Sequence, residues 1–260
     1  MIKPDTEHWI HIEESPRRVR VIFGGETIAD SNRVRLLREA GRLPVYYFPQ
    51  ADVRMDRMEP AGHSTRCPYK GEATYWTIKS GDKIAGNAAW SYLGPLPAST
   101  GIKGCVAFEW NKMEKWYEEE EEIFVHPRDP YKRVDVLQSA RHVRVTVAGE
   151  TVAETRRPRL VFETWHPTRY YVPPEDVRMD LLQPSPTGSR CPYKGIASYW
   201  SVRIGEKLFP DLVWSYREPI PECPKIKGLF CFFQEREPVI YIDGVDLPRP
   251  ETKWSRARLS

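Results

Sequence analysis

The chain has 260 residues and a formal net charge of +3, with 39 Lys and Arg against 36 Asp and Glu. Near-balanced charge gives no broad basic field for nucleic acid, and no apolar run approaches the roughly 20 residues that span a bilayer. A hydrophobic content of 40%, with 9 Trp and 13 Tyr, argues against intrinsic disorder and favours two folded domains that bind neither nucleic acid nor membrane.

The predicted elements are short β-strands, because the 24 Pro and 16 Gly interrupt the chain too often for long helices. The first strand alternates apolar and polar residues and ends at a Gly-Glu-Thr turn, which indicates a hairpin. Later strands are apolar and aromatic, and a Cys-Pro-Tyr-Lys-Gly turn separates two of them. In chain order the predicted strands of the first half cover residues 19–23, 28–29, 36–39, 46–49, 73–78 and 105–110.

An internal repeat is the strongest feature of the sequence. A constant shift of 124 residues aligns residues 18–109 with residues 142–233 without a gap, and about two in five positions are identical. The segment of six residues that begins at Arg66 returns at Arg190, and Asp-Val-Arg-Met-Asp recurs from Asp52 at Asp176. We therefore predict an all-β protein of two tandem domains with mostly antiparallel strands, related by a pseudo-two-fold axis.

The segments outside the repeats are predicted to be connections. We place the first domain at residues 1–111, an acidic linker and arm at 112–141, the second domain at 142–247 and a basic tail at 248–260. Five consecutive acids at 118–122 favour a charged helical piece followed by an extended arm. The tail is expected to be either a frayed end or a strap over the neighbouring domain.

Comparison of the two copies sorts the cysteines and histidines. Cys67 matches Cys191, whereas the other three cysteines face Leu, Ser and Ala in the opposite copy. No histidine recurs at a matched position, which removes the commonest general base and metal ligand from any chemistry that the domains share. The five cysteines are expected to be reduced thiols of a cytoplasmic protein, since the N-terminus shows no apolar signal segment.

Cys67 and Lys70, with Cys191 and Lys194, are the first candidate catalytic group. A nearby ammonium lowers the pKa of a thiol toward the reactive range, which suits a nucleophile. The alternative is a buried thiol that anchors the turn, with a solvated lysine beside it. Under that expectation of exposure, replacing both lysines by Met would barely change stability.

Carboxylates form a second candidate group. Asp52 and Asp176 are candidates for acid or base roles, and each is followed four residues later by another Asp. Turn capping with ion pairing to Arg54 or Arg66, or to their copies, explains them equally well. Glu39 and Glu163 lie in apolar strands, where a carboxylate is a better candidate for a perturbed pKa.

The aromatic residues that recur in both copies are candidates for a ligand pocket. Trp90 and Tyr92 lie two residues apart in a predicted strand and so share one face, as a pocket wall, a cation cage or a core would require. The full set is Tyr75, Trp76, Trp90 and Tyr92 in the first copy and Tyr199, Trp200, Trp214 and Tyr216 in the second.

The recurring motifs resemble the domain of unknown function 427 family in a tandem arrangement. They are Tyr-Tyr-x-Pro, Asp-Val-Arg-Met-Asp, Cys-Pro-Tyr-Lys-Gly, Trp-x-Tyr and Ile-Lys-Gly. The resemblance implies a β-tent type fold, related to methionine sulfoxide reductase B and cereblon ligand-binding folds, with no established activity; the family is also labelled nucleotidyltransferase-like. Relatives in that fold often hold zinc with two Cys-x-x-Cys pairs, which this chain lacks, so a metal-free domain without cofactors is expected.

The hypothesis favoured by these patterns is binding of a small polar metabolite in an aromatic-lined pocket. The pocket is expected between the Trp90 strand and the Cys67 turn, and at the equivalent place in the second copy. Two alternatives stay open, namely an enzyme of unfamiliar type that uses Asp, Lys or Cys, and a protein-interaction module with exposed aromatic surface. The internal pseudo-dimer is expected to exist as a monomer or a homodimer.

Overall fold

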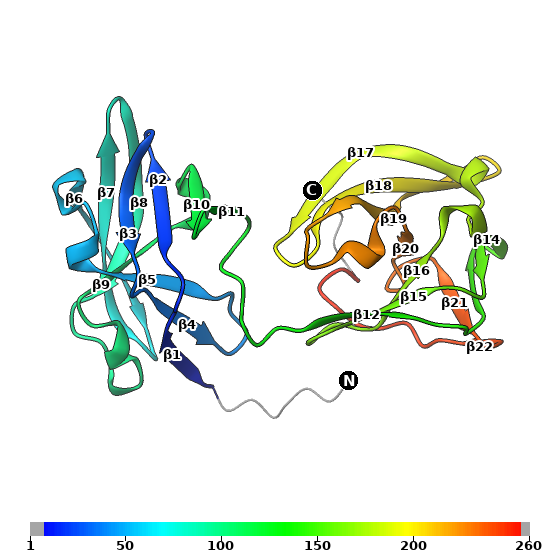
Figure 1. The fold of residues 1–260 in the computed structure, drawn as a ribbon, viewed down its shortest axis with the longest axis horizontal. Coiled ribbons are helices and arrows are strands. Elements are labelled where there is room, and N and C mark those ends of the chain that lie inside the picture. Colours follow the sequence, from blue (N-terminus) through cyan, green and yellow to red (C-terminus); the bar gives the residue numbers. More distant parts are fainter. Residues whose placement is uncertain (1–7, 256–260) are drawn as a thin grey trace. The chain divides into compact units, whose positions relative to one another are not determined.

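The computed structural model describes residues 8–255. The chain divides into two compact domains, the first ending at Asp129 and the second beginning at Pro130. Each domain has two sheets of antiparallel strands, and the described residues contain no α-helix (Figure 1). The prediction of two tandem all-β domains is confirmed. Residues 1–7, on which the expectation about a signal segment rests, lie outside the described residues.

The larger sheet of the first domain has seven strands, and β6, β7 and β8 pair in sequence order as two hairpins, whereas β1 pairs with β4 and β5 with β9. Its two long outer hairpins place the Cys-Pro-Tyr-Lys-Gly turn at one end of the sheet. The order across the sheet is β1 (Ile10–Glu14), β4 (Arg35–Glu39), β5 (Val45–Pro49), β9 (Cys105–Phe108), β8 (Lys83–Tyr92), β7 (Gly71–Ser80) and β6 (Met58–Cys67).

The smaller sheet of the first domain has four strands, in the order β11 (Glu121–Ile123), β10 (Lys115–Glu118), β2 (Val19–Phe23) and β3 (Glu26–Ser31). The β2–β3 turn requires glycine at Gly24, whose φ is +61° and whose Cβ, if present, would lie 2.7 Å from Ser80. The alternating pattern of β2 directs its apolar side chains inward, as predicted.

The second domain repeats this topology strand for strand. The orders are β12-β15-β16-β20-β19-β18-β17 and β14-β13-β21-β22. The bounds are β12 (Val134–Gln138), β13 (Val143–Val147), β14 (Glu150–Thr155), β15 (Arg159–Glu163), β16 (Arg169–Val172), β17 (Leu182–Cys191), β18 (Gly195–Ile204), β19 (Lys207–Pro219), β20 (Phe230–Phe232), β21 (Val239–Ile242) and β22 (Val245–Asp246).

Short 3-10 turns connect the strands. Most occur in matched places, such as the pair that follows β5 and the pair that follows β16. They are η1 (Gln50–Asp52), η2 (Met55–Arg57), η3 (Pro97–Ile102), η4 (Trp110–Lys112), η5 (Pro174–Asp176), η6 (Met179–Leu181) and η7 (Pro224–Ile226).

Each domain has two apolar clusters, on opposite faces of its larger sheet. In β5, Tyr46 and Phe48 belong to one cluster, whereas Tyr47 between them belongs to the other. In β7, Trp76 packs against the first cluster and Tyr75 against the second. Because successive strand residues alternate in direction, these strands are apolar on both faces. The second cluster contains Tyr75, Trp90 and Tyr92 of the predicted aromatic set, whereas Trp76 lies on the opposite face.

The acidic run is a β-hairpin, β10–β11, and not the charged helical piece that the sequence predicted. Trp116 and Glu118 alternate inward, and β10 pairs with β2. The Glu118 carboxylate accepts hydrogen bonds from Tyr46 Oη at 2.9 Å and Arg17 Nη1 at 2.7 Å. Glu119, with φ of +52°, forms the turn. Specific partners for the buried carboxylate therefore favour the strand over a solvated helix.

The described part of the C-terminal tail packs against the second domain. Thr252 Oγ1 donates a hydrogen bond to Glu235 Oε1 at 3.0 Å, and Arg236 Nε donates one to the Trp254 carbonyl at 3.3 Å. The tail up to residue 255 thus packs on the domain that it follows, and residues 256–260 of the predicted tail lie outside the described residues. The predicted extended arm forms the edge strand β12.

Candidate functional site

A buried ion pair lies at the same place in both domains. Glu39 ends β4 and accepts a hydrogen bond from the Lys70 ammonium, which the turn before β7 supplies. Glu163 and Lys194 form the equivalent pair. Lys70 is 8% exposed and Lys194 is 9% exposed, so the expectation of solvated lysines is wrong. The buried carboxylate is the reason, because it draws the ammonium out of solvent.

A second nitrogen group reaches each carboxylate from the segment before the first strand. His8 Nε2 lies 3.2 Å from Glu39 Oε1, and the His8 ring stacks on Tyr69 with centroids 3.3 Å apart. In the second domain Lys132 Nζ lies 2.9 Å from Glu163 Oε1 and 4.9 Å from the centroid of the Tyr193 ring.

His8 and Lys132 are related by the same 124-residue shift as the rest of the repeat. The sequence comparison missed both because it began ten residues later, at residue 18. Extending the gapless alignment upstream would have paired two basic residues and identified them as candidates.

The second domain adds an imidazole to the pair. His166 Nδ1 lies 3.7 Å from Glu163 Oε1. Burial lowers the pKa of His166, against the opposing effect of the Glu163 carboxylate. Although burial raises the pKa of Glu163, Lys194, His166 and Lys132 together lower it to about 2. The carboxylate is therefore ionised at neutral pH.

The absence of a matched histidine does not remove imidazole from this site. His8 and His166 occupy unmatched sequence positions, yet each lies against the equivalent glutamate of its domain. Equivalent positions of the repeat do not reveal these rings, because different segments of the chain deliver them. This corrects the conclusion that the shared site has no general base.

Apart from Trp76 and Trp200, the aromatic candidates share one cluster in each domain, and its Tyr92 or Tyr216 lies within electrostatic range of the buried glutamate. Trp90 Nε1 donates a hydrogen bond to Tyr47 Oη at 3.2 Å, and the two rings are perpendicular. Trp214 and Tyr171 repeat this arrangement at 3.1 Å. Tyr75, Trp90 and Tyr92 share an apolar cluster with Cys67, as Tyr199, Trp214 and Tyr216 do with Cys191.

The hydroxyls of Tyr92 and Tyr216 make no hydrogen bond to any residue between 8 and 255, although the side chains are only 6% and 5% exposed. Burial raises the pKa of Tyr92, and Cys67, Tyr75 and Glu39 raise it further. Both phenols thus stay neutral and can donate a hydrogen bond. The rest of each side chain is nearly buried, and its hydroxyl is left open to a hydrogen bond with a ligand or water.

The cysteines fall into two groups, as the repeat predicted. Cys67 and Cys191 are partly exposed, whereas the other three are buried. Burial raises the pKa of Cys223 to about 11 and that of Cys231 to about 12. Burial likewise raises the pKa of Cys105.

We expect iodoacetamide at pH 8 to modify Cys67 and Cys191 first in the folded protein. A thiol with a pKa near 11 is only about 0.1% thiolate at that pH, and its burial further slows attack. Peptide mass spectrometry after timed quenching would show two rapidly labelled cysteines and three that react only after denaturation. Equal labelling rates for Cys67 and Cys231 would contradict the assignment.

Asp52 and Asp176 pair with groups other than the predicted ones. Asp52 accepts hydrogen bonds from Arg33 Nη2 at 2.9 Å and Ser31 Oγ at 2.7 Å, in place of Arg54 or Arg66. The bond from Arg33 is the main reason that the pKa of Asp52 lies below its usual range. Arg157 and Thr155 hold Asp176 in the same way. The hydrogen bonds of these aspartates anchor the 3-10 turns to β3 and β14.

The following aspartates take the predicted arginine partners. Asp56 pairs with Arg54 at 2.7 Å, and Asp180 pairs with Arg178 at 2.7 Å. Both pairs are exposed, so they contribute little to stability. None of the four aspartates forms an ion pair with Lys70 or Lys194 within the described chain.

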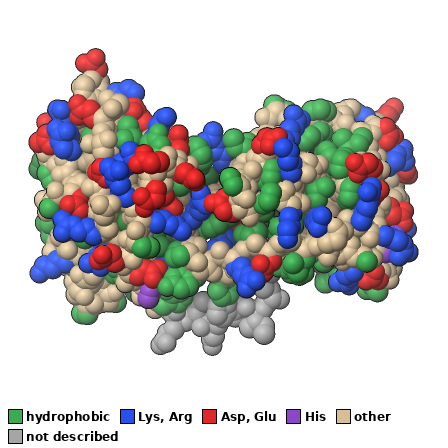
Figure 2. All heavy atoms as spheres, viewed as in Figure 1, with side chains coloured by type: hydrophobic (Ala, Val, Ile, Leu, Met, Phe, Trp, Pro, Cys, Tyr) green, Lys and Arg blue, Asp and Glu red, His purple; other side chains and the backbone are tan. Residues whose placement is uncertain are grey.

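Residues 8–255 contain no group of three or more His, Cys, Asp or Glu side chains arranged to hold a metal ion. No helix in that range is long and apolar enough to span a membrane. On the face shown in Figure 2, acidic and basic side chains are interspersed over each domain. A surface groove of about 370 Å³ lies away from the candidate residues, lined by Pro238, Val239, Asp246, Leu247, Pro248 and Arg249.

Comparison with known families agrees with the repeat. The family described as Domain of unknown function (DUF427) matches residues 11–119 and again residues 135–243. The two matches are offset by the 124 residues that relate the copies. The chain belongs to this family and contains its domain twice. A search of the curated proteins finds no match to the chain.

Proposed function

We propose that each domain binds a small polar metabolite at the edge of its aromatic cluster. The unpartnered hydroxyl of Tyr92, on a side chain within electrostatic range of the Glu39 that pairs with Lys70, carries this proposal, and Tyr216 repeats it with Glu163. The same unusual combination of a buried ion pair and a free phenol occurs twice in one chain.

The groups at this place are mostly hydrogen-bond donors. A lysine ammonium has three N–H groups, and that of Lys70 donates one hydrogen bond to Glu39. The Tyr92 phenol and the Cys67 thiol add two further donors. Such a set complements acceptor oxygens of a ligand, as in a carboxylate, a phosphate or a carbonyl group. The aromatic rings would contact the apolar part of the same ligand.

The test is the double variant Tyr92→Phe with Tyr216→Phe. Each substitution keeps the ring and removes a hydroxyl that bonds to no described residue, so the free energy of unfolding should change by less than about 0.5 kcal/mol. Metabolites that raise the melting temperature of the wild type should bind the double variant roughly five- to tenfold more weakly, because one hydrogen bond per site is lost.

Tyr46→Phe is the matched control. Its hydroxyl donates to the buried Glu118 carboxylate in the other apolar cluster, so this variant should lose stability and keep affinity. Unchanged affinity in the Tyr92 and Tyr216 double variant, or a library in which no metabolite stabilises the wild type, would overturn the proposal.

A second candidate function is a thiol-dependent reaction. Cys191 lies within electrostatic range of Lys194: burial lowers the pKa of this lysine, but the Cys191 thiol and Glu163 raise it overall. Incubating each stabilising metabolite with the wild type and with the Cys67→Ser, Cys191→Ser double variant would separate catalysis from binding. Only a catalyst would change the mass of the metabolite, and only in the wild type.

A further inference from the structure

In each domain a tyrosine and a tryptophan lie side by side on neighbouring strands, and we call this pair the aromatic row. The two domains differ in which residues cover it. Tyr75 and Trp90 are neighbours across β7 and β8, and Tyr199 and Trp214 are neighbours across β18 and β19. The row is partly exposed in the first domain, whereas Tyr199 is 6% exposed and Trp214 is 7% exposed. The second domain therefore covers a surface that the first leaves accessible.

Three side chains of the second domain provide this cover. The Phe233 ring lies 4.4 Å from Trp214 and stacks on Tyr199 at 6.3 Å, measured between centroids. The Arg169 guanidinium lies 5.5 Å from the Trp214 ring centroid and 5.6 Å from that of Trp254, which belongs to the C-terminal tail. One guanidinium thus makes cation–π contacts with two tryptophan rings.

A buried carboxylate completes the arrangement. Arg169 Nη1 donates to Glu235 Oε2 at 2.7 Å, and Arg169 Nη2 donates to Glu235 Oε1. Both residues are buried. The second domain therefore shows which chemical group this aromatic row accommodates: a planar cation with an acid beside it.

The first domain lacks the internal cation. By the 124-residue shift, Val45 stands in the place of Arg169 and Glu109 in the place of Phe233. The backbone agrees with this equivalence, since Glu109 N donates to Ala88 O at 2.8 Å and Phe233 N donates to Leu212 O at 2.9 Å. Glu109 is exposed, so the first domain presents an open aromatic row with a carboxylate at its rim.

We propose that the Tyr75–Trp90 row of the first domain binds an organic cation, a guanidinium or quaternary ammonium group, which Arg169 replaces internally in the second domain. The face of Trp90 attracts the cation, and Glu109 adds charge complementarity. This inference rests on the proposed function, because Trp90 belongs to the same cluster as Tyr92, and it names the ligand class and restricts this part of the site to one domain.

The probes are N-acetyl-arginine amide and N-acetyl-citrulline amide, which have nearly the same shape but differ in charge. Calorimetric titration of the full chain at pH 8 should give one site for the arginine probe. The citrulline probe should bind at least about tenfold more weakly. Agmatine and choline identify the source: stronger binding of these free cations favours a metabolite, and stronger binding of the amide favours an arginine in a peptide.

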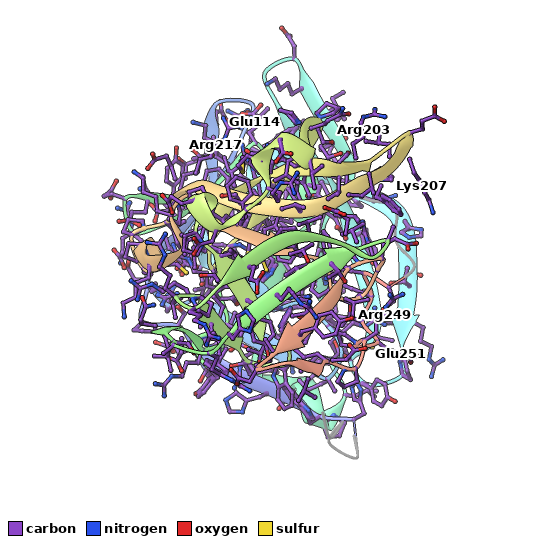
Figure 3. All side chains as sticks on the ribbon, turned by 90° about the vertical axis from the view of Figure 1, so that its right-hand side faces the viewer. Glu114, Arg203, Lys207, Arg217, Arg249 and Glu251 are labelled. Atoms are coloured by element: carbon purple, nitrogen blue, oxygen red, sulfur yellow. The ribbon has the colours of Figure 1, made fainter. Side chains whose placement is uncertain are left out.

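Two pairs of variants locate the site. Glu109→Gln should weaken the arginine probe about three- to fivefold, whereas Glu206→Gln should have no effect. Glu206 carries the same charge and is exposed in the β18–β19 turn, directly before Lys207, which Figure 3 labels. Val45→Arg places a guanidinium where the second domain has Arg169 and should abolish binding, whereas Val45→Met should retain most of it.

Equal affinity for arginine and citrulline probes, two equivalent sites, absence of binding at millimolar concentration, or equal effects of Glu109→Gln and Glu206→Gln would each overturn the inference. Thermal melting of every variant shows whether lost binding reflects unfolding. The Tyr92→Phe variant separates the two proposals. A metabolite that needs the Tyr92 hydroxyl but ignores these charge changes would keep the proposed function and refute the cation site.

Discussion

Lys70→Met should lower the free energy of unfolding of the first domain by about 3–5 kcal/mol, because it leaves the Glu39 carboxylate buried without its ammonium partner. This is opposite to the small effect that the sequence alone predicted for a solvated lysine. Among the ion pairs of residues 8–255, the carboxylate would keep the one with His8. The protein has two domains, so hydrogen exchange with mass spectrometry should report the stability of each one separately.

Lys194→Met is the matched comparison within the same chain. Glu163 keeps Lys132 at 2.9 Å after this substitution, so the second domain should lose less stability than the first does in Lys70→Met. The double variant Glu39→Leu with Lys70→Met removes both buried charges and should recover most of the loss. Unchanged protection of the first domain in Lys70→Met would show that the ammonium is solvated.

The strands and the repeat were predictable because their signals are local. Alternation in residues 19–23, the proline after Phe48 and the turn glycines need no knowledge of distant segments, and the structure has β2 at Val19–Phe23 and ends β5 at Pro49. The aromatic cluster was also predictable, since residues two apart in a strand share a face. The assignment of Tyr75 and Trp76 to opposite faces follows from the same rule.

The ion-pair partners were not predictable, because they depend on pairing between distant strands. Glu39 and Lys70 are 31 residues apart, and no spacing rule relates the end of one strand to the turn before another. The burial of Lys70 follows from that contact. Glu118 illustrates the same limit: five acids in a row indicate a solvated helix until Tyr46 and Arg17 are known to meet one of them.

The difference between the domains was visible in the sequence but had no meaning without coordinates. The exchange of Val45 for Arg169 resembles ordinary drift of a surface position between copies. Contacts with Glu235 and Trp254 give it a role, and Trp254 lies in a tail outside the repeat. Comparison of the two copies therefore identifies the residues that both domains share. It does not show that a residue present in one copy, such as Arg169, covers the aromatic row of that domain.

Acidification below pH 4.5 should destabilise the second domain selectively through Glu163. The pKa of this carboxyl falls from an ordinary 4.5 to about 2 in the folded domain. Above pH 4.5 the carboxyl is ionised in both states, and its ion pairs contribute fully. As the pH falls toward 2, the unfolded chain takes up a proton that the folded domain does not, so about 3 kcal/mol of stability is lost.

The measurement is urea unfolding at pH values from 6 to 2, for the wild type and for Glu163→Gln. Hydrogen exchange reports the unfolding of each domain separately. The variant leaves Lys194 and Lys132 without their carboxylate, so it should be less stable than the wild type at pH 6. Its stability should nevertheless depend less on pH, because the titrating group is gone. The two stability curves should converge by about 3 kcal/mol on acidification. Parallel curves would mean that the pKa of Glu163 is the same in the folded and unfolded states, and that Lys194, His166 and Lys132 do not lower it.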